Sequence, residues 1–177
     1  MEAMQIVGLV DSLELLEAIK SVRNQVFVQE QEIDSTLEFD ANDIQFKEGL
    51  ENSSTTSLLN KLRYYYIKFN GDDGEVCGTC RARKTTDSTW KIERVATLKN
   101  HRGKGLGQSL ISFVIDDLSK LDDSSNSEET TFYIHAQLSA YPFWSRGNFN
   151  NGKFIKVGED FEEASIPHCK MIYHPNK

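Results

Sequence analysis

The residues best suited to chemistry lie at positions 102–107, where the chain reads RGKGLG. Glycines have no Cβ, so the backbone N–H groups of such a segment can turn toward a ligand and approach it closely. The helix expected to follow begins with N–H groups that have no partner in its first turn, and its N-terminus carries a partial positive charge. Arg102 and Lys104 add two cations to the same segment. Together these features predict a site for a phosphate or pyrophosphate group.

Two common phosphate motifs do not fit this loop. A nucleotide P-loop requires Gly-Lys followed by Ser or Thr at a fixed spacing, and a dinucleotide fingerprint requires G-x-G-x-x-G after a short β–α–β start. Neither pattern is present here. The charge favours a polyanion, because residues 81–104 contain eight Lys or Arg and two acids in a chain of net charge −7. A solvated strand face would account for several of these cations equally well.

The residue pattern places the loop between a strand and a helix. Residues 89–98 (TWKIERVATL) have strand composition, and apolar residues recur at helical spacing from Gly105 to Leu121. Before them we expect a strand at 4–10, a helix opened by a capping box of Asp11 and Glu14, and strands at 62–69 and 75–84. After them we expect a flexible insert at 122–130, a strand at 131–137, a short helix near 138–146, and strands near 152–157 and 168–173.

This order of elements predicts an α+β fold with a mixed, mostly antiparallel central sheet of six to seven strands flanked by helices. A length of 177 residues fits one domain, spanning 1–177. No apolar run approaches the ~20 residues of a membrane helix, and the first residues lack the basic start and apolar block of a secretory signal. The net negative charge argues against a nucleic-acid partner. Three cysteines are too few for a disulfide scaffold. We therefore expect a cytoplasmic or nuclear location, with no membrane partner and no metal.

The loop and several other segments resemble the GNAT superfamily of N-acetyltransferases. The hallmark of that superfamily is [Q/R]-x-x-G-x-[G/A], whose three fixed positions are filled here by Arg102, Gly105 and Gly107. Further segments resemble one branch of small GNAT enzymes: R-x-x-V-F-V-x-E-Q from Arg23, E-x-D-x-x-D from Glu38, I-E-R-V-A from Ile92, H-A-Q from His135, and E-A-x-I-P-H-x-x-M ending at Met171. The resemblance implies the GNAT fold and acetyl transfer from acetyl-CoA.

The resemblance also implies where coenzyme A binds. The pyrophosphate would lie on the backbone of the loop, and the pantetheine arm would run along the preceding strand like an added strand. The cofactor-binding residues implied are Val95, Ala96, Thr97, Arg102, Gly103, Lys104, Gly105, Leu106, Gly107 and Gln108. The N–H of Val95 or Ala96 would polarise the acetyl carbonyl, as a fixed donor does in an oxyanion hole.

Catalysis requires proton removal, because an acceptor amine resembling lysine has a pKa of ~10.4 and arrives protonated. Glu93 is the first candidate base, and a salt bridge with the basic strand is its competing structural role. Alternative bases are Glu30, Asp40, Asp43 and His168. At the position of the family's usual tyrosine acid stands Trp144, and Asn148 replaces the usual glycine. Since an indole cannot supply a proton to a thiolate, we expect Tyr141 to substitute, or the thiolate to leave directly to water.

The acceptor is the least specified part. Glu30, Asp40, His135 and His168 are the candidate substrate-binding residues, and the acids among them would attract a cationic amine. We expect direct attack by a primary amine of a small molecule or amino sugar in a ternary complex. A protein or peptide N-acetyltransferase and a non-catalytic module that binds coenzyme A are the alternatives. The resemblance further implies a homodimer formed by the C-terminal strands.

Overall fold

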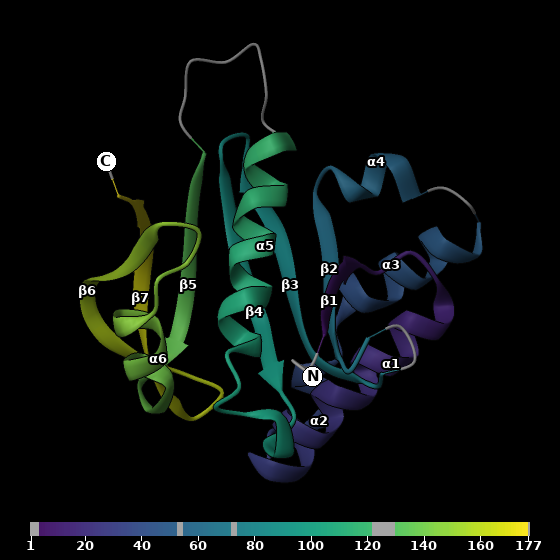
Figure 1. Cartoon of the computed structure of the whole chain (residues 1–177), viewed down its shortest axis with the longest axis horizontal. Coiled ribbons are helices and arrows are strands. Elements are labelled where there is room, and N and C mark those ends of the chain that lie inside the picture. The colour runs from purple at the N-terminus through teal and green to yellow at the C-terminus, as the bar shows by residue number, and fades with distance from the viewer. Residues whose placement is uncertain (1–3, 53–54, 72–73, 122–129, 177) are drawn as a thin grey trace.

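The structure is a computed structural model that describes residues 4–52, 55–71, 74–121 and 130–176. Across these residues seven strands form one sheet in the order β1-β2-β3-β4-β5-β7-β6 (Figure 1). The strands are β1 (Gln5–Leu9), β2 (Leu62–Phe69), β3 (Val76–Thr86), β4 (Thr89–Thr97), β5 (Thr131–Gln137), β6 (Gly152–Glu163) and β7 (Ile166–Pro175). All neighbours are antiparallel except β4 and β5, which run parallel. The predicted mixed, mostly antiparallel α+β sheet is confirmed.

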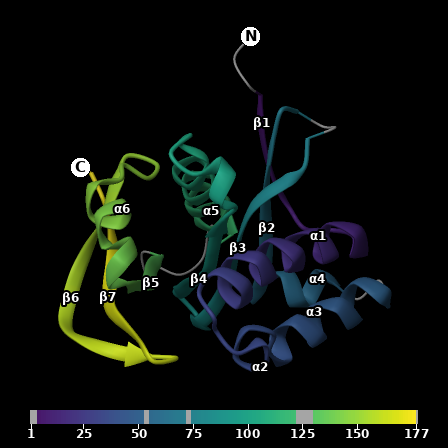
Figure 2. The same cartoon turned by 90° about the horizontal axis from the view of Figure 1, so that it is seen from below.

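Helices cover both faces of this sheet. Figure 2 shows α5 on one face and the helices α1 to α4 on the other. The helical segments are α1 (Leu13–Arg23), the π-helix η1 (Asn24–Glu30), α2 (Ser35–Glu38), α3 (Ala41–Glu51), α4 (Thr55–Leu59), the 3-10 turn η2 (Lys99–His101), α5 (Leu106–Leu121), the 3-10 turn η3 (Leu138–Ala140) and α6 (Tyr141–Arg146). None of the helices in the described ranges has the length and apolar character needed to span a membrane.

Most predicted boundaries agree with the structure, and two differ. The predicted strands 62–69 and 131–137 match β2 and β5 to the residue. The first helix is capped by Ser12, whose Oγ accepts the N–H of Leu15, and not by a box of Asp11 and Glu14. The last two strands extend well beyond 152–157 and 168–173, because β6 and β7 continue as a long hairpin. The predicted flexible insert at 122–130 lies, apart from its last residue, outside the described residues.

The main core lies between the sheet and α5. Residues of α5 such as Leu110 and Val114 are fully buried against Ile134 of β5 and Ile92 of β4. Successive side chains of a strand point to opposite faces. Because Phe132, Ile134 and Ala136 of β5 are buried in this core, Tyr133, His135 and Gln137 lie on the other face of the sheet. The packing of α5 therefore decides which residues of β5 can reach a ligand.

The sheet divides where β4 meets β5. Their parallel pairing covers only three residue pairs in the described chain, from Thr89↔Thr131 to Lys91↔Tyr133, and beyond these the strands separate (Figure 1). On its other side β4 carries a bulge: Glu93 is opposite Arg81 and Ala96 is opposite Thr79, so two residues of β4 face one of β3. Arg94 lies in this bulge with a left-handed φ of 55°. The C-terminal halves of β4 and β5 therefore do not pair with each other, and their facing edges are available to a ligand.

Candidate active site

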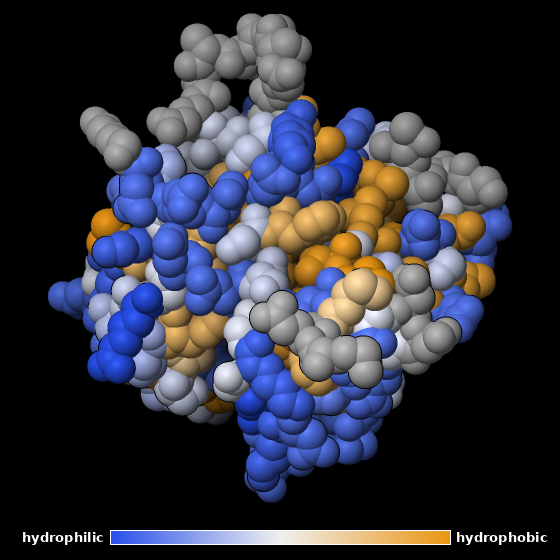
Figure 3. Space-filling view, viewed as in Figure 1, coloured by the Kyte–Doolittle hydropathy of each residue, from blue (hydrophilic) through white to orange (hydrophobic). Residues whose placement is uncertain are grey.

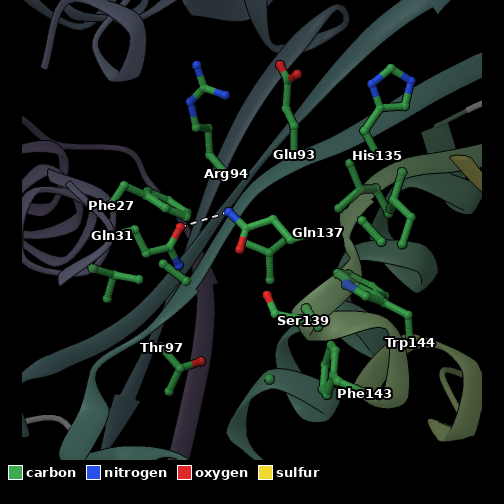
Figure 4. A pocket seen from close by; sticks show the side chains of 18 of the residues that line it. Phe27, Gln31, Glu93, Arg94, Thr97, His135, Gln137, Ser139, Phe143 and Trp144 are labelled. Carbon is green, nitrogen blue, oxygen red and sulfur yellow. Dashed lines mark hydrogen bonds between the residues drawn. The ribbon is translucent and has the colours of Figure 1, made fainter. Parts of the chain in front are cut away.

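A cavity of about 820 Å³ lies between the separated ends of β4 and β5. Pockets of roughly 300–1,000 Å³ are typical of small-molecule and cofactor sites. Its donor end is lined by loop residues between Arg102 and Gln108, and its middle by residues 95–97 of β4 and 136–137 of β5. The opposite end, called here the acceptor end, is lined by residues 91–94 of β4, residues 134–135 of β5, η1, the segment after it and the β6–β7 hairpin (Figure 4). One continuous space therefore joins the predicted anion loop to a polar region on the face of the sheet opposite α5.

The loop has the geometry of an anion site. For the backbone N–H groups of residues 105–108, no hydrogen-bond partner is found within the described chain. Gly103 and Gly105 have φ values of 75° and 78°, a conformation that favours glycine. A Cβ at either glycine would meet no atom within 4 Å, so the backbone conformation, and not a lack of space, requires glycine there. These free amides at the start of a 16-residue helix fit a pyrophosphate group.

The guanidinium of Arg102 is already paired with a carboxylate. Its Nη1 and Nη2 donate to the two oxygens of Glu30 at 2.6 and 2.7 Å, and its Nε donates to the carbonyl of Thr97 at 3.0 Å. The hydrogen bonds from Arg102 hold the pKa of Glu30 below its usual value. Glu30 is not among the residues lining the cavity. Glu30, a candidate substrate residue at the end of η1, therefore contacts the cofactor loop as the partner of Arg102.

Lys104 also points away from the cavity. Its ammonium lies 4.7 Å from the centre of the Phe69 ring, and it is absent from the cavity lining. The other candidate cofactor residues of the loop and of β4 line the cavity: Val95, Ala96, Thr97, Arg102, Gly103, Gly105, Leu106, Gly107 and Gln108. The structure thus brings the candidate cofactor residues other than Lys104 to one cavity, and their role in binding coenzyme A stays a prediction.

Glu93 lines the cavity but is held by three cations. Its carboxylate lies 2.9 Å from Arg81 Nε, 3.2 Å from Arg83 Nε and 3.4 Å from Lys91 Nζ, with 9% of the side chain exposed. Burial alone would raise the pKa of Glu93, but these three cations outweigh it and the pKa is lowered. The arrangement matches the salt-bridge role that the sequence left open. A carboxylate with a lowered pKa is a weak proton acceptor.

The acids at 38–43 belong to a buried network behind Glu93. Arg23, which is fully buried, donates to Glu38 and to Asp43. Arg81 donates to both oxygens of Asp40 at 2.8 Å. Asp40 also caps α3, forms a capping box with Asp43, and does not line the cavity. The E-x-D-x-x-D segment therefore anchors α2 and α3 to the sheet, and the structure does not bring Asp40 to the candidate substrate site.

The candidate acid also lies away from the cavity. Tyr141 begins α6, is 36% exposed and is not a lining residue. Trp144 lines the cavity at 5% exposure and packs between the rings of Phe143 and Phe154, whose centroids are 4.9 and 5.1 Å away. Figure 4 shows Trp144 and Phe143 beside Ser139, whose hydroxyl faces the cavity. Ser139, which no sequence motif identified, is a lining residue of the cavity on this side.

The two candidate substrate-binding histidines, His135 and His168, both line the acceptor end. His135 Nδ1 lies 2.8 Å from a carboxylate oxygen of Glu163, and His168 Nδ1 lies 2.7 Å from the carbonyl oxygen of Ile166. Both partners can only accept a hydrogen bond, so Nδ1 carries the hydrogen in each ring. In the neutral form of each ring, Nε2 therefore holds the free lone pair. Glu163 is a partner that the sequence alone did not indicate.

A pair of amide side chains joins the two walls of the cavity. Gln137 Nε2 donates to Gln31 Oε1 at 2.7 Å, linking β5 to the end of η1 (Figure 4). Gln137 is also opposite His168 in the β5–β7 register, so their side chains share one face. Both glutamines stand within segments that carry the family resemblance, H-A-Q and V-F-V-x-E-Q. That position was the only signal that could have identified them in advance.

Comparison with known proteins agrees with the fold and the loop. Residues 24–145 match the model of the acetyltransferase (GNAT) family. The chain is 27% identical over 151 residues to an uncharacterized N-acetyltransferase, YjcF, of Bacillus subtilis, covering 85% of this chain and 86% of that protein. The chain belongs to the GNAT acetyltransferase family, and its enzyme class is that of an N-acetyltransferase.

Solved structures share the fold at low sequence identity. An acyl-CoA N-acyltransferase from Pseudomonas aeruginosa superposes with a TM-score of 0.68 at 22% identity, covering 97% of this chain and 99% of the other. A spermidine N-acetyltransferase from Vibrio cholerae, in complex with CoA and spermine, gives a TM-score of 0.63 at 14% identity, covering 96% and 94%. These likenesses show the fold. Family membership supports a donor built on coenzyme A.

Proposed function

We propose that this protein transfers the acetyl group of acetyl-CoA to the primary amine of a small molecule, by direct attack in a complex that contains both substrates. One observation carries the proposal: a single cavity joins the free amides of the loop at 105–108 to a polar end with two histidines. Donor and acceptor can therefore be held at the same time. Direct attack needs no covalent enzyme intermediate.

The residues present fit coenzyme A. The amides of residues 105–108 hold the pyrophosphate, and the edge of β4 from Val95 to Thr97 accepts the pantetheine arm, because β5 does not pair with it there. When bound, acetyl-CoA supplies a thioester carbonyl for the amine to attack. The N–H of Val95 or Ala96 is the donor that stabilises negative charge on the carbonyl oxygen.

The leaving thiolate needs little help, since an alkyl thiol has a pKa near ~8.5. The indole N–H of Trp144 and the hydroxyl of Ser139 can hydrogen-bond a thiolate without giving up a proton. This arrangement replaces the tyrosine acid and favours release of the thiolate to water. It also accounts for the position of Tyr141 outside the cavity lining.

The acceptor is a compact amine. The cavity must hold the pantetheine arm as well, so only part of its 820 Å³ is left for the second substrate. The carboxylates Glu38 and Glu93 at the acceptor end are bound to arginine, which leaves less free negative charge for a polycation than the sequence suggested. A homodimer through the exposed edge strand β6, where Ile155 is 51% exposed, and a cytoplasmic location remain predictions.

The test combines binding and turnover. Calorimetry should detect coenzyme A binding, and thiol release from acetyl-CoA should increase when a panel of small primary amines, amino sugars and short peptides is added. Binding without turnover on any amine would favour a non-catalytic module and refute the proposal. Turnover on peptides alone would refute the small-molecule acceptor. No binding at all would remove the assignment of the loop.

A further inference from the structure

We propose that His135 accepts the proton of the acceptor amine and that Glu163 holds it in position to do so. This inference rests on the proposed function and deepens it, by naming the base and the residue that orients it. Neither Glu163 nor a dyad with His135 was part of the site expected from the sequence. The argument depends on the geometry at the acceptor end of the cavity.

The two side chains come from different strands and meet at the cavity wall. His135 lies on the face of β5 opposite α5, and Glu163 is the last residue of β6. Their contact is 2.8 Å long, and both residues line the cavity. Figure 4 shows His135 at the same end of the cavity as Glu93 and Arg94, beyond Gln137. The ring also packs edge-on against Phe161, with centroids 4.8 Å apart, so two neighbours fix its orientation.

The carboxylate partner fixes the tautomer. Because Glu163 can only accept, Nδ1 of His135 donates and Nε2 keeps a lone pair. The negative charge of Glu163 also stabilises the imidazolium that forms when Nε2 takes up a proton. Within the described residues, Nε2 of His135 has no hydrogen-bond partner that would compete with a substrate. This is the base-plus-orienting-group arrangement found in many hydrolytic triads.

The other candidate bases are less suited. Glu93 is neutralised by three cations, and Asp40 and Glu30 lie outside the cavity lining. His168 lines the cavity, but its Nδ1 partner is the neutral carbonyl of Ile166. A carbonyl stabilises an imidazolium less than a carboxylate does, because it carries no net charge. His135 is therefore the histidine whose partner carries the charge that complements an imidazolium.

Several charged or titratable groups lie on the elements packed around His135. They are Lys91 and Glu93 of β4, Tyr133 of β5, Glu163 of β6, and His168 and Lys170 of β7. Lys91 is tied to Glu93, and the ammonium of Lys170 lies over the ring of Tyr133 at 4.7 Å. The carboxylate of Glu163 is thus the charge in direct contact with the ring.

The proton transfer balances with the acetyl transfer. The acceptor ammonium gives one proton to Nε2 of His135 and becomes a neutral amine. The lone pair of the amine forms the C–N bond to the acetyl carbon, the C–S bond breaks, and its electron pair leaves on sulfur. The new amide nitrogen then loses one further proton to water, and the released thiolate takes up a proton from water. The imidazolium returns its proton to water, so each turnover releases one proton.

Kinetics on an amine that the wild-type chain acetylates test the role of His135. In H135Q we expect kcat at neutral pH to fall by roughly 10²–10⁴-fold, the usual contribution of a general base. The loss should shrink as pH rises, because the free amine then forms without the enzyme. The acid limb that His135 imposes on the wild-type kcat profile should be lost, and the remaining rise of kcat with pH should follow the deprotonation of the acceptor amine. H174Q, at an exposed position of β7, is the matched control and should behave as wild type.

The role of Glu163 is tested without turnover. Ring ¹⁵N chemical shifts of neutral His135, assigned with H135Q and measured without amine or acetyl-CoA, should show the Nδ1–H tautomer. E163L should move the ring toward the Nε2–H tautomer and lower kcat by at least roughly 10-fold, less than H135Q does. E163Q keeps an acceptor oxygen, so relative to E163L it should restore part of the Nδ1–H tautomer and part of kcat. E162L, at the exposed neighbouring position, should change neither.

The outcomes separate the two claims. If H135Q keeps kcat within about two-fold of wild type, or if E163L leaves the tautomer unchanged, the dyad does not act as proposed. If wild type binds coenzyme A but acetylates no amine, the proposed function fails first and this role fails with it. A tautomer that depends on Glu163, together with a lost acid limb in H135Q, supports both.

Discussion

The two ends of the cavity are built in different ways. The donor end uses main-chain N–H groups of residues 105–108, which one loop and one helix provide together. The acceptor end uses side chains from η1, β4, β5 and the β6–β7 hairpin, many of them tied into ion pairs. A backbone site tolerates many side chains but few backbone conformations. A side-chain site depends on the packing of elements far apart in the sequence. The predictions that follow test this contrast, from the largest expected effect to the smallest.

The largest effect is expected in the network behind the acceptor end. Replacing Arg23 with Met leaves Glu38 and Asp43 buried with reduced compensation. Removing one partner of a buried ion pair typically costs about 3–5 kcal/mol. Urea denaturation should show that loss in R23M. R83M is the control, because Arg83 is a partly exposed partner of Glu93 and exposed pairs contribute ~0–1 kcal/mol. Equal stability of the two variants would contradict a structural network.

At the donor end, the expected effect is on affinity. Gly105 has a φ of 78°, and a side chain there costs roughly 1–2 kcal/mol in the left-handed conformation. We expect G105A to weaken coenzyme A binding by about 10-fold, measured by calorimetry. Gly158 has a φ of 68° on β6, away from the cavity, so G158A carries the same strain and should bind normally. Similar losses in both variants would point to general destabilisation.

A smaller effect is expected at Glu30. Its carboxylate occupies the guanidinium of Arg102 in the free protein, where a phosphate would compete for the same donors. E30Q removes that competing charge, and we expect coenzyme A to bind a few-fold more tightly, in line with the ~0–1 kcal/mol of an exposed pair. Calorimetry at low and high salt measures the change, which should shrink as salt rises. Weaker binding in E30Q would mean that Glu30 positions Arg102 for the ligand.

The smallest effect concerns acid stability. The hydrogen bond from His135 lowers the pKa of Glu163 from its ordinary value of 4.5 to about 2, against the opposing effect of partial burial. A depressed carboxyl pKa adds stability above the unfolded value that is lost as pH falls through the folded one. Between pH 4.5 and pH 2 wild type should therefore lose more unfolding free energy than E163Q, by chemical denaturation. Parallel curves would indicate that the contact with His135 contributes little in solution.

Prediction from sequence worked where a property is local. The free amides of the loop follow from glycines placed before an amphipathic helix, and β2 and β5 follow from short apolar runs with clear ends. It left Glu93 open between a base and a salt-bridge residue, because its partners Arg81 and Arg83 lie across a strand pairing with a bulge that residue types do not specify. Glu163 was missed because its contact with His135 depends on how far the β6–β7 hairpin extends. Positions along a strand can be predicted, whereas contacts between strands depend on register.

The hydrogen bond between Gln137 and Gln31 has a consequence for how a donor is admitted. The pantetheine arm contains two amide groups, each with a donor and an acceptor. An arm that lies along the edge of β4 in this cavity can exchange partners with these two glutamines, which also line it, amide for amide. No buried polar group is then left without a hydrogen-bond partner. Leaving one unpaired would cost its full desolvation penalty. We therefore expect the hydrogen bond between Gln137 and Gln31 to hold the two walls together in the free protein. The amides of the pantetheine arm can replace this bond at little cost in free energy, whereas an alkyl chain without amides cannot.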